Sequence, residues 1–166
     1  IIPDDAHGRS RIDDIPPEKL GAAMDDGEIA VIAGFQGVTR DGRIATLGRG
    51  GSDTSPVAVA AAPGAACDIY TDVDGVYTTD PRIESKAKKL AKISYEEMLE
   101  MASLGAKVLE TRSVALAMQH QVRLQVLSSF TDQPGTLVVD ESEIVEQQIV
   151  SGIAYSRDEA KITLVG

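Results

Sequence analysis

The sequence has few of the features expected of a membrane protein, a disulfide-bonded protein or a protein that binds nucleic acid. It has 166 residues, no Trp, one Cys and an aromatic share of only 4%. One Cys excludes a disulfide framework, and no apolar run approaches the roughly 18 residues that span a bilayer. Lys and Arg number 16 against 26 Asp and Glu, for a net charge of −10. Because such a surface repels phosphate backbones and anionic lipids, we expect neither nucleic acid nor membrane as a partner.

The start of the chain carries no secretion signal. It has neither a basic segment nor an apolar one, and it lacks an initiator Met. We therefore expect a cytoplasmic protein and interpret Ile1 as a cut end. The apolar share of 43% predicts a folded chain, and the length allows one domain, or one domain with a fragment of another.

Short apolar runs alternate with helical patterns along most of the chain. Residues 29–33 are apolar throughout, which predicts a strand buried on both faces, as in a parallel sheet. Helices that alternate with strands favour an α/β sheet. The other expected strands are 43–47, 67–71, 122–127 and 136–139, and the expected helices are 18–24, 95–102 after a Ser94 cap, and 108–120.

Two prolines frame a further helical stretch at residues 57–62. Pro56 is tolerated only near the first helical turn, so we expect Ser52, Asp53 or Thr54 to lie close to the N-cap. Pro63 is expected to end the stretch. After an acidic joint at 140–146, residues 149–155 and 160–165 read as two more strands, and two strands alone make no stable core. We therefore expect the chain to enter a second domain near its end.

A glycine-rich segment, Gly48-Arg49-Gly50-Gly51-Ser52-Asp53, joins an expected strand to this helix. Exposed N–H groups and the positive end of a helix attract phosphate or carboxylate, and an Arg grips a carboxylate bidentately. No Gly-Lys-Ser/Thr follows, so it is not a Walker loop, and it also lacks the last glycine of the dinucleotide fingerprint. The segment predicts an anion site; the alternative is a mobile turn capped by Ser52.

A second polar segment, residues 71–82, follows the expected strand 67–71. It holds three carboxylates, four hydroxyls and one Arg, at the sheet edge where α/β proteins bind ligands. Counted from Asp72, Val76 and Tyr77 fall where a calcium loop needs an oxygen ligand and a Gly, which excludes that site. A solvated loop with Asx-turns at Asp72 and Asp80 stays an alternative.

Few other side chains suggest chemistry. Lys107 follows Gly105 and can reach a phosphate, although an exposed surface lysine is the commoner case. His7 and His120 lie far apart, without the Cys/His spacing of a zinc site, so we predict no protein-held metal. Cys67, within an expected strand, is interpreted as a small buried apolar residue.

Four segments in order resemble the aspartate kinase family, which has the amino-acid kinase (carbamate-kinase-like) fold. They are residues 33–37, 46–54, 69–82 and 94–109. The resemblance covers nearly the whole chain and implies an α/β fold with a mainly parallel central sheet, here in its C-terminal, nucleotide-binding lobe. It also implies transfer of the ATP γ-phosphoryl group to the β-carboxylate of L-aspartate, giving 4-phospho-L-aspartate, the first step toward lysine, threonine and methionine.

The resemblance also implies roles for individual residues. Asp53 would orient the catalytic lysine, and Lys107 would reach the nucleotide. Mg²⁺ would be held mainly by the phosphates. The aspartate-binding residues would be Arg49, Gly50, Gly51 and Ser52, and the ATP-binding residues Thr71, Asp72, Tyr77, Thr78, Thr79, Asp80, Pro81 and Arg82.

The family's Lys-Phe-Gly-Gly-Thr-Ser type loop is absent from this sequence. We therefore expect residues 1–140 to be the C-terminal part of the kinase domain, 141–148 a linker, and 149–166 the start of an incomplete regulatory ACT domain. We expect a homo-oligomer, formed through the kinase and ACT regions, that needs the missing N-terminal half, and no activity from this chain alone. The alternatives are a non-catalytic fragment that binds nucleotide or an effector, and a related amino-acid kinase.

Overall fold

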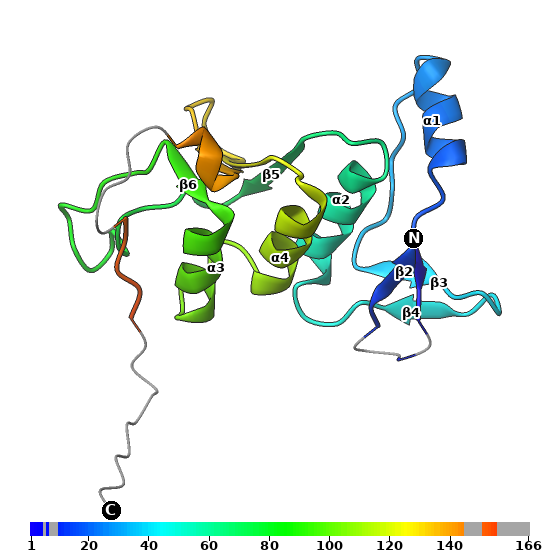
Figure 1. Cartoon of the computed structure of the whole chain (residues 1–166), viewed down its shortest axis with the longest axis horizontal. Coiled ribbons are helices and arrows are strands. Elements are labelled where there is room, and N and C mark those ends of the chain that lie inside the picture. Colours follow the sequence, from blue (N-terminus) through cyan, green and yellow to red (C-terminus); the bar gives the residue numbers. More distant parts are fainter. Residues whose placement is uncertain (5, 7–9, 145–150, 156–166) are drawn as a thin grey trace, which may run out of the picture.

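Four strands form the main sheet in a computed structural model that describes residues 1–4, 6, 10–144 and 151–155 (Figure 1). Two pairs of neighbouring strands are parallel, β5 with β7 and β6 with β8, while β7 and β8 are antiparallel. This mostly parallel arrangement confirms the expected α/β class. The strands lie in the order β5 (Cys67–Thr71), β7 (Leu124–Ser128), β8 (Thr136–Val139) and β6 (Lys92–Ser94).

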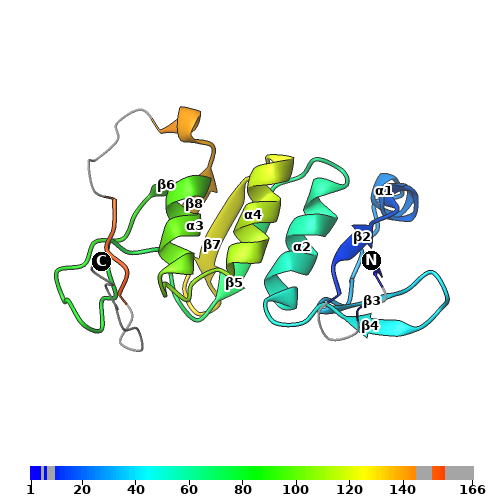
Figure 2. The same ribbon diagram turned by 60° about the horizontal axis from the view of Figure 1, so that its bottom comes forward.

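Three helices pack side by side against one face of this sheet (Figure 2). They are α2 (Gly51–Ala61), α3 (Tyr95–Ser103) and α4 (Thr111–His120). Alternate residues of β7 are buried, as expected for a strand with one covered face. Val57, Met98 and Val114, one from each helix, are fully buried in the core between helices and sheet.

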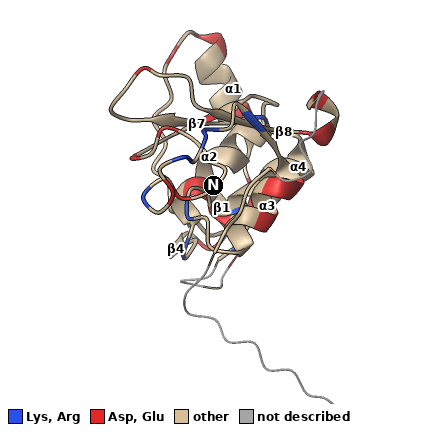
Figure 3. Cartoon of the chain, turned by 90° about the vertical axis from the view of Figure 1, so that its left-hand side faces the viewer, with Lys and Arg blue, Asp and Glu red and all other residues tan. Residues whose placement is uncertain are grey.

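Helix α3 confirms its sequence pattern in detail. Ser94 Oγ accepts a hydrogen bond from the Glu97 N–H at 3.2 Å, and the Glu97 carboxylate accepts one from the Ser94 N–H at 3.2 Å. This capping box fixes where the helix begins. Gly105, with φ of 111°, lies just beyond its end. Red segments of the α3 ribbon in Figure 3 mark its acidic residues, of which Glu96 and Glu100 are exposed.

The N-terminal part carries two small antiparallel sheets. They pair β1 (Ile2–Pro3) with β2 (Ile12–Asp14) and β3 (Gln36–Val38) with β4 (Ile44–Thr46), and α1 (Pro17–Asp25) lies beyond them (Figure 1). The Val38 N–H donates to the Ile1 carbonyl at 3.1 Å, which joins the two sheets. Helix α1 and strand β4 confirm the expected helix at 18–24 and strand at 43–47.

Residues 29–33 do not form the expected buried strand. They have no regular secondary structure, and the side chains of Ile29 and Val31 are 92% and 94% exposed. A strand needs a neighbour for its N–H and C=O groups, and the described part of the chain offers this segment none. Apolar composition alone predicted burial without revealing whether a partner strand was available.

The start of α2 lies close to Ser52, as expected, but Pro56 is not in the first turn. The N-cap is Gly50, with a left-handed φ of 73°, two residues before Ser52. Pro56 therefore lies inside the helix, where it has no N–H to donate. The hydroxyls of Thr54 and Ser55 donate one turn back, to the carbonyls of Gly50 and Gly51 at 2.8 and 2.6 Å. The helix ends at Ala61, before Pro63, as expected.

Helix α4 begins three residues later than predicted. The sequence indicated a start at Val108, but residues 106–110 form a turn and the helix starts at Thr111. Leu109 is buried in the core from this turn, so its apolar character is satisfied without a helix.

A short 3-10 helix, η1 (Glu141–Glu143), opens the expected linker. Residues 151–155 form no strand, although the Ile153 N–H donates to the Thr78 carbonyl at 2.7 Å. The rest of the two strands expected near the C-terminus lies outside the described residues. Within the described ranges, no helix has the length and apolar character needed to cross a membrane.

Candidate active site

The glycine-rich segment forms a tight turn at the N-terminus of α2. Gly48 and Gly50 both have positive φ, 76° and 73°, and the Gly51 N–H donates to the Gly48 carbonyl at 3.1 Å. A Cβ added at Gly51 would lie 2.8 Å from the Leu47 Cβ, so a larger residue would push the turn apart. The turn places backbone N–H groups at the positive end of the helix, as an anion site requires.

Arg49 projects from this turn into solvent. It is exposed, and it makes no hydrogen bond or ion pair with any residue in the described ranges. Its guanidinium is therefore available to a carboxylate. Ser52 is exposed in the first turn of α2, and Asp53 points toward α4, where it accepts a long hydrogen bond of 3.4 Å from the Glu110 N–H.

The start of α4 supports the turn, a feature that our reading of the sequence missed. The Glu110 side chain lies against Gly50, because a Cβ at Gly50 would be 2.8 Å from the Glu110 Cγ. Arg112 Nη1 donates to the Leu47 carbonyl at 2.8 Å. These partners lie 60 or more residues apart in the chain, and no local pattern signals such contacts.

The second predicted segment begins where β5 ends. Asp72 is exposed and accepts a hydrogen bond from the Thr71 hydroxyl at 3.1 Å. Tyr77 instead points into the protein's own network, since its hydroxyl donates to the Asp74 carboxylate at 3.0 Å. Lys89 Nζ lies 3.2 Å from the same carboxylate. Burial raises the pKa of Asp74, but hydrogen bonds from Lys89 and Tyr77 outweigh it and hold that pKa below the usual value.

Thr136 fastens the base of this segment to the sheet. Its buried hydroxyl accepts from the Val76 N–H at 2.8 Å and donates to the Leu90 carbonyl at 2.6 Å. Thr78 pairs with the returning chain, donating its N–H to the Lys88 carbonyl at 2.9 Å. The base of the segment is thus fixed to the sheet, and the segment is an excursion from it. The alternative of a solvated loop is confirmed in part, because the Asp80 carboxylate accepts from the Arg82 N–H at 2.9 Å, as in an Asx-turn.

Asp80 and Arg82 pair with each other at the far end of the excursion. Arg82 donates through Nε and Nη2 to the two carboxylate oxygens of Asp80, at 3.0 and 2.8 Å. These bonds hold the pKa of Asp80 below its usual value. Pro81, between the two residues, is exposed. We expected Arg82 to be available to phosphate, whereas here it is held by Asp80. A phosphate must therefore compete with that carboxylate. Thr79 is half-buried next to the pair.

Chain direction brings the two segments to one end of the molecule. Helix α2 and strand β5 are joined by residues 62–66 and run in opposite directions, so the start of α2 and the end of β5 lie at the same end (Figure 2). The N-terminus of α4 meets the glycine turn there as well. Lys107 is exposed in the turn just before α4.

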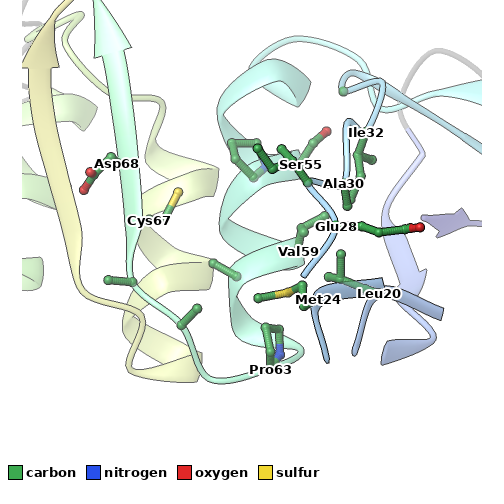
Figure 4. A pocket seen from close by; sticks show the side chains of 16 residues that line it. Leu20, Met24, Glu28, Ala30, Ile32, Ser55, Val59, Pro63, Cys67 and Asp68 are labelled. Atoms are coloured by element: carbon green, nitrogen blue, oxygen red, sulfur yellow. The ribbon is translucent and has the colours of Figure 1, made fainter. Parts of the chain in front are cut away.

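A separate groove with a volume of about 570 Å³ lies between α1, α2 and the start of β5 (Figure 4). Its walls are mainly apolar and include Met24, Ile32 and Val59. None of the residues predicted to bind substrate or nucleotide lines it. Phosphate and carboxylate need cations and N–H donors, so the glycine turn and the excursion form the better candidate site.

Cys67 lines this groove and is otherwise buried, which confirms its interpretation as a small buried residue. Burial raises the pKa of its thiol to about 11, with a further contribution from the charge of Asp68. Relative to the ordinary value of 9.0, the folded protein carries about 100-fold less thiolate near neutral pH. We expect iodoacetamide at pH 8 to alkylate the folded protein far more slowly than the urea-unfolded chain. Equal rates would show that Cys67 is accessible and ionised. Since the chain has one Cys, intact mass reports this site alone.

Comparison with known proteins identifies the family of this chain. The model of the "Amino acid kinase family" matches residues 3–128. Among curated proteins, an aspartate kinase of Pseudomonas putida is 57% identical and an aspartokinase of Pseudomonas aeruginosa 56% identical, each across the whole chain. The chain spans 41% of the length of either relative.

Solved structures agree with this result. Escherichia coli aspartokinase III, in complex with aspartate and ADP, superposes with a TM-score of 0.73 at 36% identity, over 83% of this chain and 32% of that one. Aspartate kinase from Synechocystis is 53% identical, with a TM-score of 0.64, over 73% of this chain and 21% of the other. A UMP kinase from Bacillus anthracis shares only the fold, at 19% identity and a TM-score of 0.59. With the family model matching most of its length, the chain belongs to the amino acid kinase family.

Proposed function

We propose that this chain is part of an aspartate kinase, which transfers the γ-phosphoryl group of ATP to the β-carboxylate of L-aspartate. The observation that carries the proposal is the exposed Arg49, which has no partner among the described residues, on a glycine turn at the positive end of α2. That combination suits a carboxylate, and it lies in a chain 57% identical to the P. putida enzyme. The UMP kinase likeness extends to the fold alone, so it does not favour a nucleotide as phosphoryl acceptor.

The division of the site follows from the two segments. The glycine turn, from Arg49 to Ser52, binds aspartate, and the excursion from Thr71 to Arg82, together with Lys107, binds ATP. The solved E. coli relative binds aspartate and ADP, which supports one site for each ligand. Phosphoryl transfer depends on positioning and charge neutralisation, and Arg82 and Lys107 supply positive charge on this chain. Mg²⁺, bound mainly by the phosphates, supplies further neutralisation.

Catalysis in this proposal needs the longer protein. The relatives are more than twice as long as this chain, since 41% of their length matches it. We propose that residues 1–140 complete the C-terminal part of a kinase domain and that residues 149–166 begin an ACT domain. Asp53, at the start of α2, then orients a lysine supplied by the preceding half of the kinase domain.

The Arg82→Ala variant of the full-length protein tests the assignment of the nucleotide site. We expect ATP binding to weaken by roughly 1 to 3 kcal/mol, the range of a lost charge-assisted contact, with aspartate binding nearly unchanged. Calorimetric titration with a non-hydrolysable ATP analogue, and separately with aspartate, measures both affinities.

Arg40→Ala is the matched control, because Arg40 is also an exposed Arg paired with a carboxylate, that of Asp13 at 2.8 Å, but lies outside both segments. It is expected to leave both affinities unchanged. Weaker binding of aspartate, and not of nucleotide, in Arg82→Ala would overturn the division of the site.

A further inference from the structure

Arg112 occupies an unusual position for a cation. It lies in the first turn of α4, and its half-buried guanidinium donates Nη1 to the Leu47 carbonyl at 2.8 Å and Nη2 to the Ser10 carbonyl at 2.9 Å. Leu47 and Ser10 are both fully buried. Among the described residues, no carboxylate forms an ion pair with Arg112. The hydrogen bonds of Arg112 therefore go to main-chain carbonyl groups and not to an acidic side chain.

One of these carbonyls sets the orientation of the glycine turn. Leu47 immediately precedes Gly48, and its N–H donates to the Phe35 carbonyl at 2.9 Å. With Arg112 on its carbonyl, Leu47 is held at both of its main-chain groups. Downstream, the Gly50 carbonyl accepts from the Thr54 hydroxyl of α2 at 2.8 Å. Arg49 lies between these two fixed points, so Arg112 holds the upstream end of the turn from which Arg49 extends into solvent.

The fork of a guanidinium suits this task. Arg presents several N–H groups in one rigid plane, so two acceptors can be held at fixed positions at once. A Lys ammonium is a point charge on a flexible stem and holds such a pair less rigidly. The two acceptors lie 37 residues apart in sequence, and Arg112 is the group that joins them to α4.

We propose that Arg112 is a positioning residue for substrate binding. Through the Leu47 carbonyl it holds the glycine turn so that Arg49, beside the positive end of α2, faces the substrate carboxylate. Arg112 itself touches no substrate. The inference rests on the proposed function, because it assumes that the glycine turn binds aspartate.

Steady-state kinetics of the full-length protein test the proposal with Arg112→Ala and Arg112→Lys. A displaced binding loop lowers catalytic efficiency by up to about 100-fold, so we expect kcat/KM for aspartate to fall roughly 10- to 100-fold in Arg112→Ala, through KM for aspartate, while KM for ATP stays within about twofold. Arg112→Lys should fall between wild type and Arg112→Ala. Millimolar guanidinium ion should restore part of the aspartate KM of Arg112→Ala. If Arg112→Ala does not fold, Arg112→Lys carries the test.

Parallel measurements separate this inference from the proposed function. If Arg49→Ala raises KM for aspartate and the Arg112 variants do not, the positioning role is wrong and the function stands. If Arg49→Ala leaves KM for aspartate unchanged, the assignment of the turn to aspartate fails. Equal increases in KM for both substrates, with a lower melting temperature and no guanidinium rescue, would show that Arg112 only stabilises the fold.

Discussion

Replacing Arg49 by alanine in the full-length protein is expected to lower kcat/KM for aspartate, with a loss of about 2 to 4 kcal/mol of transition-state binding energy. The KM for ATP should change little. The guanidinium has no partner among the described residues, so its removal leaves no buried group unpaired. The melting temperature should therefore stay at the wild-type value, and the loss should appear in kinetics alone. An assay that couples ADP formation to NADH oxidation, with aspartate varied at saturating ATP, measures it.

Arg49→Lys is the informative companion. It keeps the positive charge and loses the bidentate geometry, so its kcat/KM should lie between those of wild type and Arg49→Ala. If both variants match wild type for aspartate, Arg49 is not part of the substrate site. If Arg49→Lys is as poor as Arg49→Ala, geometry contributes more than charge.

Gly135→Ala is expected to be the most destabilising single substitution that we identify. A Cβ at this position would lie 1.7 Å from the Val126 carbonyl oxygen and 2.8 Å from its carbon, so the ends of β7 and β8 must separate. Val126 and Thr136 are directly paired in this antiparallel hairpin. We expect the free energy of unfolding to fall by about 4 kcal/mol or more, at the upper end of single-residue effects.

Urea unfolding followed by far-UV circular dichroism measures this effect, and Gly21→Ala is the matched control. Gly21 lies within α1, and an added Cβ there meets nothing within 4 Å. Ala in a helix is favoured over Gly by roughly 0.5 to 1 kcal/mol, so this variant should be as stable as wild type or slightly more so. A wild-type unfolding midpoint for Gly135→Ala would contradict the close approach of the two strands.

Sequence patterns predicted those elements whose signals are local. The start of α3 is determined by Ser94 and Glu97, which lie three residues apart and bind each other. Strand β5 was predicted as a compact segment that the polar residues 72–75 end, and its bounds agree with the structure. Residues 29–33 carried an equally clear apolar signal, but strand formation depends on a neighbour that periodicity does not reveal.

The candidate site shows the same division between local and distant information. Composition identified both polar segments, because glycine, carboxylates and Arg gather there within a few residues. It did not reveal that Asp80 holds Arg82, although the two are neighbours, because either carboxylate or phosphate satisfies a guanidinium. The contacts of Arg112 join residues 65 and 102 positions apart, a relation that only the folded chain creates.

The clamp that Thr136 forms at the base of the excursion has a consequence for how this protein can change over evolution. The Leu90 N–H donates to the Val76 carbonyl at 2.8 Å, and both residues also bond to the Thr136 hydroxyl. The chain between Val76 and Leu90 is therefore a loop whose two ends are held together. Doubling the length of such a closed loop costs only about 0.6 kcal/mol of entropy. Insertions and deletions around residues 83–87 are therefore expected to cost little stability, and the excursion that we propose to bind ATP can diversify in length while the sheet beneath it keeps its register.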